Sequence, residues 1–203
     1  TQLTDEQRAV VDCNGRFIVV NAYAGTGKTS TGVAYTEARP RERFLYVALN
    51  KAIQMEAASK FPSNTVAQTT HSVAWNSFGR TYQPKLGNLK PFDIASRFGL
   101  PFQDAKRVVD TLSSFICSAD ARMDEQHLPE EVRQDMTRAR VFDSARRAWQ
   151  AMCDTSDPLT MPHDGYLKLF ALSKPDFSGR FDTILFDEAQ DANPVTAQIL
   201  LNQ

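Results

Sequence analysis

The chain has 203 residues, of which 42% are hydrophobic and 23% are charged, which is ordinary for a soluble globular chain of one large or two small domains. Its formal net charge of −1 gives no whole-protein attraction to nucleic acid, so any such binding requires a local basic patch. No apolar run approaches the roughly 20 residues that span a bilayer, and the amino terminus has no signal-peptide pattern.

Apolar, β-rich segments alternate with helical segments in the first third of the chain. Strands are predicted at 17–21, 43–48 and 65–69. Helices are predicted at 28–38, at 51–60 and from about residue 70. Because strand–helix alternation produces a parallel sheet covered by helices, we expect an α/β fold.

The middle of the chain has little strand signal. Apolar residues recur with helical spacing in 103–119 and 129–153, and the next apolar strand pattern is Asp182–Phe186. We therefore expect a sheet domain formed by residues 1–78 and 181–203, with a mostly helical subdomain, residues 79–180, inserted into it.

A glycine-rich run follows the first predicted strand and precedes a helix. Gly25 and Gly27 let the backbone curl so that N–H groups point inward, and the helix near Lys28 directs its positive end to the same place. Lys28 would then reach the β- and γ-phosphates of a nucleotide, and Thr29 would ligate Mg²⁺. Ala22 stands where the general pattern has glycine. The alternative is a turn that only joins a strand to a helix.

An acidic cluster follows the strand predicted at Asp182–Phe186. Asp187, at the carboxyl end of a parallel strand, can hold a hydrated Mg²⁺ between two phosphates. Glu188 is placed to orient or deprotonate the attacking water. The alternative is a solvated helix start capped by Asp191 or Asn193.

Five ordered motifs carry a resemblance to a known family. They are Leu3–Gln7, Ala24–Thr29, Ala48–Ala52, Thr69–Ser72 and Asp187–Asn193. In this order they resemble the amino-terminal half of a superfamily 1 DNA helicase of the UvrD/Rep/PcrA type. Three further segments, Arg39–Tyr46, Phe61–Pro62 and His163–Leu169, are similar to the F-box DNA helicase branch, although no F-box segment is visible.

The resemblance implies a RecA-like P-loop NTPase domain, of the type called 1A, with a 1B-like helical insertion. It also implies movement on single-stranded DNA with 3′-to-5′ polarity, using ATP and Mg²⁺. The implied partners are single-stranded DNA, duplex junctions, a second motor domain, and repair or recombination proteins, with no membrane. The location would be the cytoplasm, with the nucleoid, in a bacterium and the nucleus in a eukaryote.

The resemblance also implies three sets of site residues. The catalytic set is Lys28, Asp187 and Glu188, with Thr29 and Asp187 as Mg²⁺ ligands. The nucleotide-binding set is Gln7, Ala24, Gly25, Thr26, Gly27, Lys28, Thr29, Ser30 and Gln190. The DNA-binding set is Asn50, Lys51, Thr70, His71 and Ser72.

Several of these residues have a structural alternative. Gln7 has an amide suited to the adenine edge, but Thr4 and Gln7 also form a capping-box pattern. Thr70 and Ser72 are suited to phosphate contacts and equally to helix capping, and Lys51 to a solvated surface. His71 has no second His or Cys at the spacing that a metal site needs.

Two further features of the helical region have both a functional and a structural interpretation, and a third has no assigned chemistry. The aromatic residues Trp75, Phe78 and Tyr82 could stack bases or belong to the core. The arginines 138, 140, 146 and 147, opposed only by Asp143, form either a duplex-binding patch or a solvated helix face. The segment His163–Leu169 predicts a turn followed by a helix start, and no chemistry follows from it.

The cysteines and the end of the sequence give two further expectations, one about the redox compartment and one about the extent of the protein. The three cysteines, Cys13, Cys117 and Cys153, are scattered without a Cys-x-x-Cys pair, which indicates neither a disulfide framework nor a zinc site and fits a reducing compartment. The sequence ends within a helix predicted to begin after Pro194, before any second motor domain. We therefore expect a fragment that binds nucleotide better than it hydrolyses it, because related motors need an arginine from across the cleft.

Two other functions remain open at this point. One is a nucleotide-binding or partner-docking module without motor activity. The other is phosphoryl transfer to a small molecule, which does not account for Glu188 or for the polar segment Thr70–Ser72.

Overall fold

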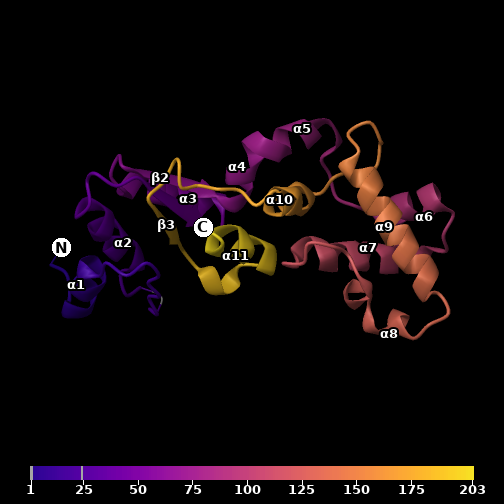
Figure 1. The fold of residues 1–203 in the computed structure, drawn as a ribbon, viewed down its shortest axis with the longest axis horizontal. Coiled ribbons are helices and arrows are strands. Elements are labelled where there is room, and N and C mark those ends of the chain that lie inside the picture. The colour runs from indigo at the N-terminus through magenta and orange to yellow at the C-terminus, as the bar shows by residue number, and fades with distance from the viewer. Residues whose placement is uncertain (1, 24) are drawn as a thin grey trace. The chain divides into compact units, whose positions relative to one another are not determined.

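The computed structural model describes residues 2–23 and 25–203. The chain divides into two compact units, a sheet unit (residues 1–70, 176–191 and 203) and a helical unit (residues 71–175 and 192–202). Figure 1 labels their α-helices and the strands β2 and β3, and each unit is described by itself. The domain boundaries expected from the sequence, 1–78 and 181–203 against 79–180, remain a prediction; in the structure α11 (Pro194–Leu201) clusters with the helical unit.

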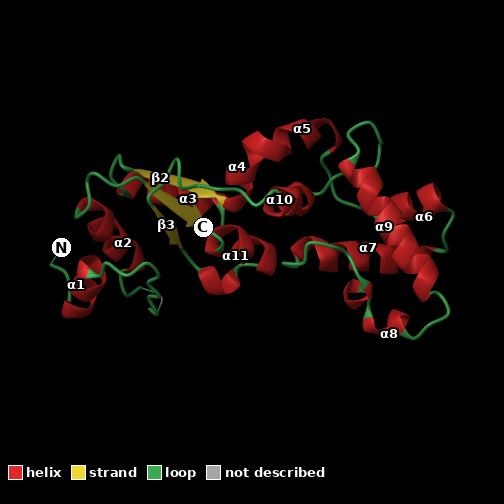
Figure 2. Cartoon of the chain, viewed as in Figure 1, coloured by secondary structure: helices red, strands yellow, loops and turns green. Residues whose placement is uncertain are grey.

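The sheet unit contains three parallel strands in the order β2-β1-β3, shown in yellow in Figure 2. They are β1 (Phe44–Ala48), β2 (Thr65–Thr69) and β3 (Thr183–Phe186). The central strand β1 is an unbroken apolar run that is buried at every position, as expected for a parallel strand with neighbours on both sides. The mixed α/β architecture with a parallel sheet is therefore confirmed.

Helices α1 (Asp5–Asp12), α2 (Lys28–Glu37) and α3 (Lys51–Lys60) complete this unit, with a short 3₁₀ turn at Ala189–Asp191. Tyr46 of β1 packs on Phe61 at the end of α3 with ring centroids 4.8 Å apart. Val33 of α2 and Leu185 of β3 pack against the same cluster. One apolar cluster thus joins α2, α3 and the sheet.

Arg43 and Asp182 join the two distant parts of the sequence that form the sheet. The Arg43 backbone N–H donates to the Asp182 carboxylate at 2.8 Å, and the Asp182 N–H donates to the Arg43 carbonyl at the same distance. The Arg43 guanidinium beside Asp182 lowers the pKa of that carboxyl. This reciprocal pair sets the register in which β3 begins beside β1.

The strand predicted at 17–21 is wrong. No ladder pairing includes this segment among the described residues, and Phe17 and Val19 are 70% and 69% exposed. A strand needs a neighbour for its backbone N–H and C=O groups, and this segment pairs with neither open edge of the sheet, at β2 or at β3. Apolar β-rich composition was therefore not sufficient to form a strand here.

The helical unit follows β2 through α4 (Thr70–Ala74), a π-helical turn at Trp75–Gly79, and α5 (Arg80–Tyr82). Its other helices are α6 (Pro91–Phe98), α7 (Phe102–Cys117), α8 (Glu130–Arg133), α9 (Arg138–Cys153), α10 (His163–Leu172) and α11, with 3₁₀ turns at Gln83–Lys85 and Glu125–His127. Val108 and Leu112 of α7 and Ala145 and Ala148 of α9 are fully buried in its core.

Three predictions for this region need correction. The helix predicted at 129–153 is two helices, because the Asp135 carboxylate accepts from the Thr137 N–H at 3.0 Å and stabilises a turn between α8 and α9. The turn predicted at His163 is the first turn of α10, which begins directly after Pro162. Helix α11 ends at Leu201 with Asn202 as its C-cap, so it does not run through the last residue.

Gly165 explains why the His-Asp-Gly sequence misled the turn prediction. A Cβ atom at this position would clash with the Met161 sulfur. The glycine is therefore required for a close approach inside a helix and not for a turn. None of the helices described is both long and apolar enough to cross a membrane.

Candidate nucleotide-binding site

The glycine-rich turn has the backbone geometry that an anion cradle needs. Gly25 and Gly27 have φ values of 79° and 88°, in the left-handed region that favours glycine. Gly27 is the N-cap of α2 and supplies no side-chain acceptor for the first N–H groups of this ten-residue helix. Those N–H groups and the positive end of the helix dipole suit a phosphate, so the turn fits the nucleotide that its sequence implies. Ala24 lies outside the described residues.

Lys28 and Glu188 meet directly, although they are 160 positions apart in the sequence. The Lys28 ammonium lies 2.6 Å from Glu188 Oε1, with the two side chains 30% and 27% exposed. This hydrogen bond is the main reason that the pKa of Lys28 is raised and that of Glu188 is lowered. Both groups are therefore ionised across the neutral range.

Glu188 is also held by its neighbours. The Gln190 side-chain amide donates to Glu188 Oε2, so both carboxylate oxygens have partners. The backbone of Glu188 has a φ of 50°, which is unusual for a residue with a side chain and occurs often at functional sites. Within the acidic cluster after β3, Glu188 is thus directed toward Lys28 rather than toward bulk solvent.

Asp187 is positioned by a tyrosine that sequence reasoning missed. The Tyr46 hydroxyl donates a short hydrogen bond to Asp187 Oδ2, and the Asp187 N–H donates to the Val47 carbonyl at 3.2 Å. Burial is the main cause, and this hydrogen bond the second, of a raised pKa for Tyr46. The only sequence signal was a hydroxyl-bearing residue in the middle of an otherwise apolar strand.

Gln7 forms the capping box that was the structural alternative to adenine binding, and it also contacts the glycine-rich turn. Its carbonyl oxygen accepts from the Thr4 N–H at 3.0 Å in a capping box. Its amide donates to the Thr26 carbonyl at 3.2 Å. A Cβ at position 27 would lie 2.8 Å from the same amide nitrogen, so a larger residue there would displace the Gln7 side chain. Gln7 thereby joins α1 to the turn that would hold phosphates.

The remaining nucleotide and metal residues lie in the expected elements. Thr29 and Ser30 occupy the first turn of α2, and Thr26 donates its hydroxyl to the Tyr23 carbonyl at 2.7 Å. The residues that the structure describes include no group of three or more His, Cys, Asp or Glu side chains suited to a metal. A Mg²⁺ site would therefore depend on Thr29, Asp187 and the phosphates together, and stays a prediction.

The predicted DNA-binding residues of the sheet unit follow the carboxyl ends of its strands. The Asn50 side chain caps α3 by accepting from the Ile53 N–H at 3.0 Å. Lys51 is exposed and donates to the Gln54 side chain at 2.6 Å. Thr70 follows β2 directly and is buried. These positions allow Lys51 to contact a phosphate, whereas the Asn50 oxygen already has a structural partner.

In the helical unit, His71 pairs with a residue of the His163–Leu169 segment. His71 Nε2 lies 3.0 Å from Asp164 Oδ1, and this bond is the main cause of a lowered pKa for Asp164. Ser72 lies in the same short helix, α4. The structure therefore connects two motifs that are 93 positions apart.

The structure shows the surroundings of the aromatic residues and the arginines that were candidates for DNA binding in the helical unit. Tyr82 is buried and donates to the Cys153 carbonyl at 2.9 Å, so it belongs to the core. Trp75 and Phe78 pack edge-on against Tyr166 and Phe170. The four arginines of α9 do not form a uniform patch: Arg138 pairs with Glu125, Arg140 with Asp104, and Arg147 lies over Phe98, whereas Arg146 does none of these.

Comparison with known proteins identifies helicase relatives. The chain is 36% identical to F-box DNA helicase 1 of chicken, Gallus gallus, over 229 aligned positions, covering all of this chain and 22% of the relative. It is 30% identical to F-box DNA helicase protein 1 of Schizosaccharomyces pombe over 231 positions, covering 99% of this chain and 26% of that protein. No protein-family model and no solved structure matches. The chain thus spans 22% and 26% of the lengths of these relatives, and the similarity supports a relationship to DNA helicases.

Proposed function

We propose that this chain is the nucleotide-binding part of an ATP-dependent DNA helicase of superfamily 1, of the UvrD/Rep/PcrA type, that moves 3′-to-5′ on single-stranded DNA. The observation that carries the proposal is the direct contact of Lys28 with Glu188 at 2.6 Å, beside two left-handed glycines at the start of α2. Similarity to two proteins named as DNA helicases supports the choice of DNA as the substrate. Such a substrate would place the protein in the nucleus of a eukaryote or the nucleoid of a bacterium.

Each residue of the site has a role in this proposal. The N–H groups at the start of α2 and Lys28 bind the phosphates of ATP, while Thr29 and Asp187 hold Mg²⁺. Gln190 positions the Glu188 carboxylate. Bound Mg·ATP would supply the γ-phosphoryl group, and Glu188 would accept a proton from the attacking water as the bond between the γ-phosphorus and the β–γ bridging oxygen breaks and ADP leaves.

The ion pair gives the site a resting state. Without nucleotide, the charges of Lys28 and Glu188 neutralise one another. Phosphates of a nucleotide compete with Glu188 for the Lys28 ammonium, because both are anionic acceptors of the same N–H donors. Binding therefore frees the carboxylate, which is ionised at neutral pH because its pKa is lowered.

The proposal is tested by titrating the chain with a fluorescent ATP analogue in the presence of Mg²⁺. We expect Lys28→Ala to abolish binding and Lys60→Ala to leave it unchanged. Lys60 is a suitable control because it is an exposed lysine of α3 whose ammonium pairs with Glu56 on the same helix. Equal affinities of the Lys28→Ala and unmodified chains would refute the assignment.

The alternative, a nucleotide-binding or partner-docking module without motor activity, makes a different prediction. It also requires Lys28 for binding, but a protein that contains this chain together with a second motor domain would not displace a DNA strand when ATP is added. ATP-dependent strand displacement by that protein, lost in Lys28→Ala, would exclude the module.

A further inference from the structure

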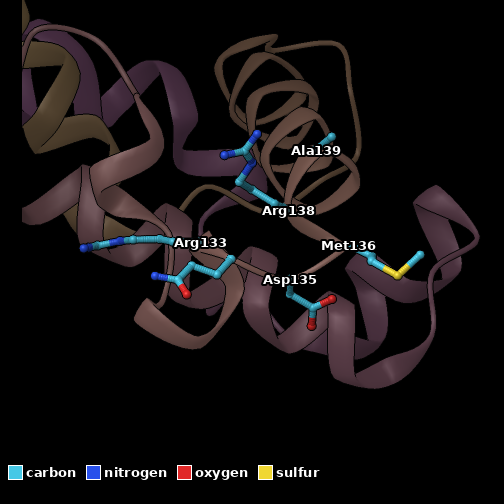
Figure 3. Close-up of a pocket in the computed structure, with 6 residues that line it drawn as sticks. Arg133, Asp135, Met136, Arg138 and Ala139 are labelled. Atoms are coloured by element: carbon cyan, nitrogen blue, oxygen red, sulfur yellow. The ribbon is translucent and has the colours of Figure 1, made fainter.

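Two surface cavities of the helical unit, among the residues described, differ in whether the charged side chains that line them already have partners. The first, of about 440 Å³, is lined by residues 133–136, 138 and 139 in the turn before α9. The Arg133 guanidinium donates to the Gln126 and Leu128 carbonyls, and Arg138 pairs with Glu125. In Figure 3 the side chains of Arg133 and Met136 extend in opposite directions. This cavity therefore presents no converging free groups.

The second cavity, of about 340 Å³, lies between α9, the end of α7 and the loop that follows α7. Its walls include Arg122, Met123, Phe142, Arg146, Trp149 and Gln150. Phe142, Arg146 and Trp149 are four and three positions apart on α9, so one face of this helix supplies two aromatic rings with an arginine between them. The cavity lies at the small end of the size range of small-ligand sites.

In the part of the chain that the structure describes, the two arginines of this cavity, Arg122 and Arg146, are unpaired. Among the residues described, neither the Arg122 nor the Arg146 guanidinium has an ion pair or a hydrogen bond. The nearby acidic side chains of Asp120 and Asp124 are engaged, since both lie within 3.3 Å of the buried His127 ring. Asp143, on α9 itself, does not line the cavity. Two exposed cations therefore remain available to an anionic ligand at this wall.

The cavity walls are supported from behind. Trp149 packs edge-on against the buried Phe115 ring, with centroids 5.5 Å apart. The fully buried Lys168 donates to the Ser118 and Asp120 carbonyls at 2.9 and 2.6 Å, immediately before Arg122 in the loop. These contacts hold the loop in place before any ligand arrives, which reduces the entropy lost on binding. They also give a structural role to Lys168, in the His163–Leu169 segment for which the sequence indicated no chemistry.

We propose that this cavity binds one nucleotide of a single-stranded DNA segment, with the base against Trp149 and the adjoining phosphates on Arg122 and Arg146. An aromatic face stacks any unpaired base, and a guanidinium forms paired hydrogen bonds with phosphate oxygens. A base paired in a duplex could not expose its face to Trp149, so the ligand is a single strand. The inference rests on the proposed function only for the choice of DNA, and it assigns a contact outside the predicted DNA-binding set.

Trp149 is itself the reporter for the test. The chain has two tryptophans, so Trp75→Phe leaves Trp149 as the only one. We expect Trp149 emission to be quenched when this variant is titrated with a twelve-nucleotide oligothymidine, and no change when free thymidine is added at the same concentration. A labelled oligonucleotide followed by anisotropy reports total DNA binding in parallel.

The arginine contribution is tested with a matched pair of variants. Arg146→Ala and Arg147→Ala remove the same charge from neighbouring positions of α9, but only Arg146 lines the cavity. We expect Arg146→Ala to weaken binding more than Arg147→Ala. Loss of both Arg122 and Arg146 should reduce the salt dependence of log affinity by about 1.4, since each single-strand phosphate contact contributes about 0.7.

The inference is overturned if DNA binds while Trp149 emission is unchanged, or if the Arg146 and Arg147 variants behave alike. It is also overturned if no DNA binds up to about 100 µM, the weak end of non-specific affinities. None of these results affects the Mg·ATP titration with Lys28→Ala. Refutation of DNA binding at the cavity is therefore distinguishable from refutation of the proposed function.

Discussion

Replacement of Tyr46 by Phe removes one oxygen atom and with it the hydrogen bond to Asp187. The ring and its contact with Phe61 are retained. A hydrogen bond to a charged group contributes about 1.5–3 kcal/mol to stability. Because Asp187 is only partly buried, water can replace part of this bond, and we expect the low end, about 1.5 kcal/mol. For a chain of this length, that corresponds to a melting temperature lower by about 3–6 °C.

The second effect of Tyr46→Phe is on the metal-dependent part of nucleotide binding. Without Tyr46 the Asp187 carboxylate loses the contact that orients it, so we expect weaker binding of Mg·ATP and unchanged binding of ADP without Mg²⁺. Circular dichroism melting and a fluorescent-nucleotide titration measure the two effects on the same samples.

Tyr35→Phe is the matched control. Tyr35 is also buried in the sheet unit and packs edge-on against Phe44, but among the residues described its hydroxyl has no hydrogen-bond partner. We expect this variant to melt within about 1 °C of the unmodified chain. If Tyr46→Phe matches Tyr35→Phe in both stability and Mg·ATP affinity, the role assigned to Tyr46 is wrong.

Three other predictions follow from charges in the two units. Glu188→Gln, in a helicase that contains this chain, should retain Mg·ATP binding and lose phosphate release, and normal turnover would refute its role as base. The Lys28–Glu188 pair should stabilise the fold above the ordinary glutamate pKa of 4.5, and this stabilisation should be lost as the pH falls through the lowered pKa of Glu188. It should also be lost as the pH rises through the raised pKa of Lys28. Chemical denaturation of unmodified and Lys28→Met chains from acid to alkaline pH measures this. A difference in the free energy of unfolding between the two chains that persists at low pH would contradict the prediction. Burial lowers the pKa of Lys168 to about 8, below its ordinary 10.5, so stability should rise between these pH values and Lys168→Met should remove that rise.

The elements that sequence reasoning placed correctly are those with local signals. The predictions at 51–60 and 65–69 match α3 and β2 at both ends, because Asn50 caps the helix and a β-branched and polar pattern marks the strand. The glycine-rich turn could be predicted because a left-handed backbone favours glycine, and Gly25 and Gly27 have that backbone in the structure.

Some errors were local, such as the turn at Asp135 that separates α8 from α9, but others concern interactions between distant residues. Residues 17–21 have strand composition, but a strand forms only where its backbone pairs with the edge of a sheet, and no local pattern shows whether that pairing occurs. The role of Tyr46 depends on the register that brings β1 beside β3. The pairing of His71 with Asp164 joins positions whose separate patterns gave no reason to connect them.

Hydrogen exchange of the backbone amides around Gly25–Thr31, with and without Mg·ATP, tests the central claim most directly. If the N–H groups at the start of α2 bind phosphates, exchange in this segment should slow on addition of Mg·ATP, and Lys28→Ala should remove the effect. A segment in the helical unit such as α6 serves as an internal reference and should not change. Unchanged exchange at residues 25–31 under conditions that saturate nucleotide binding would contradict the account.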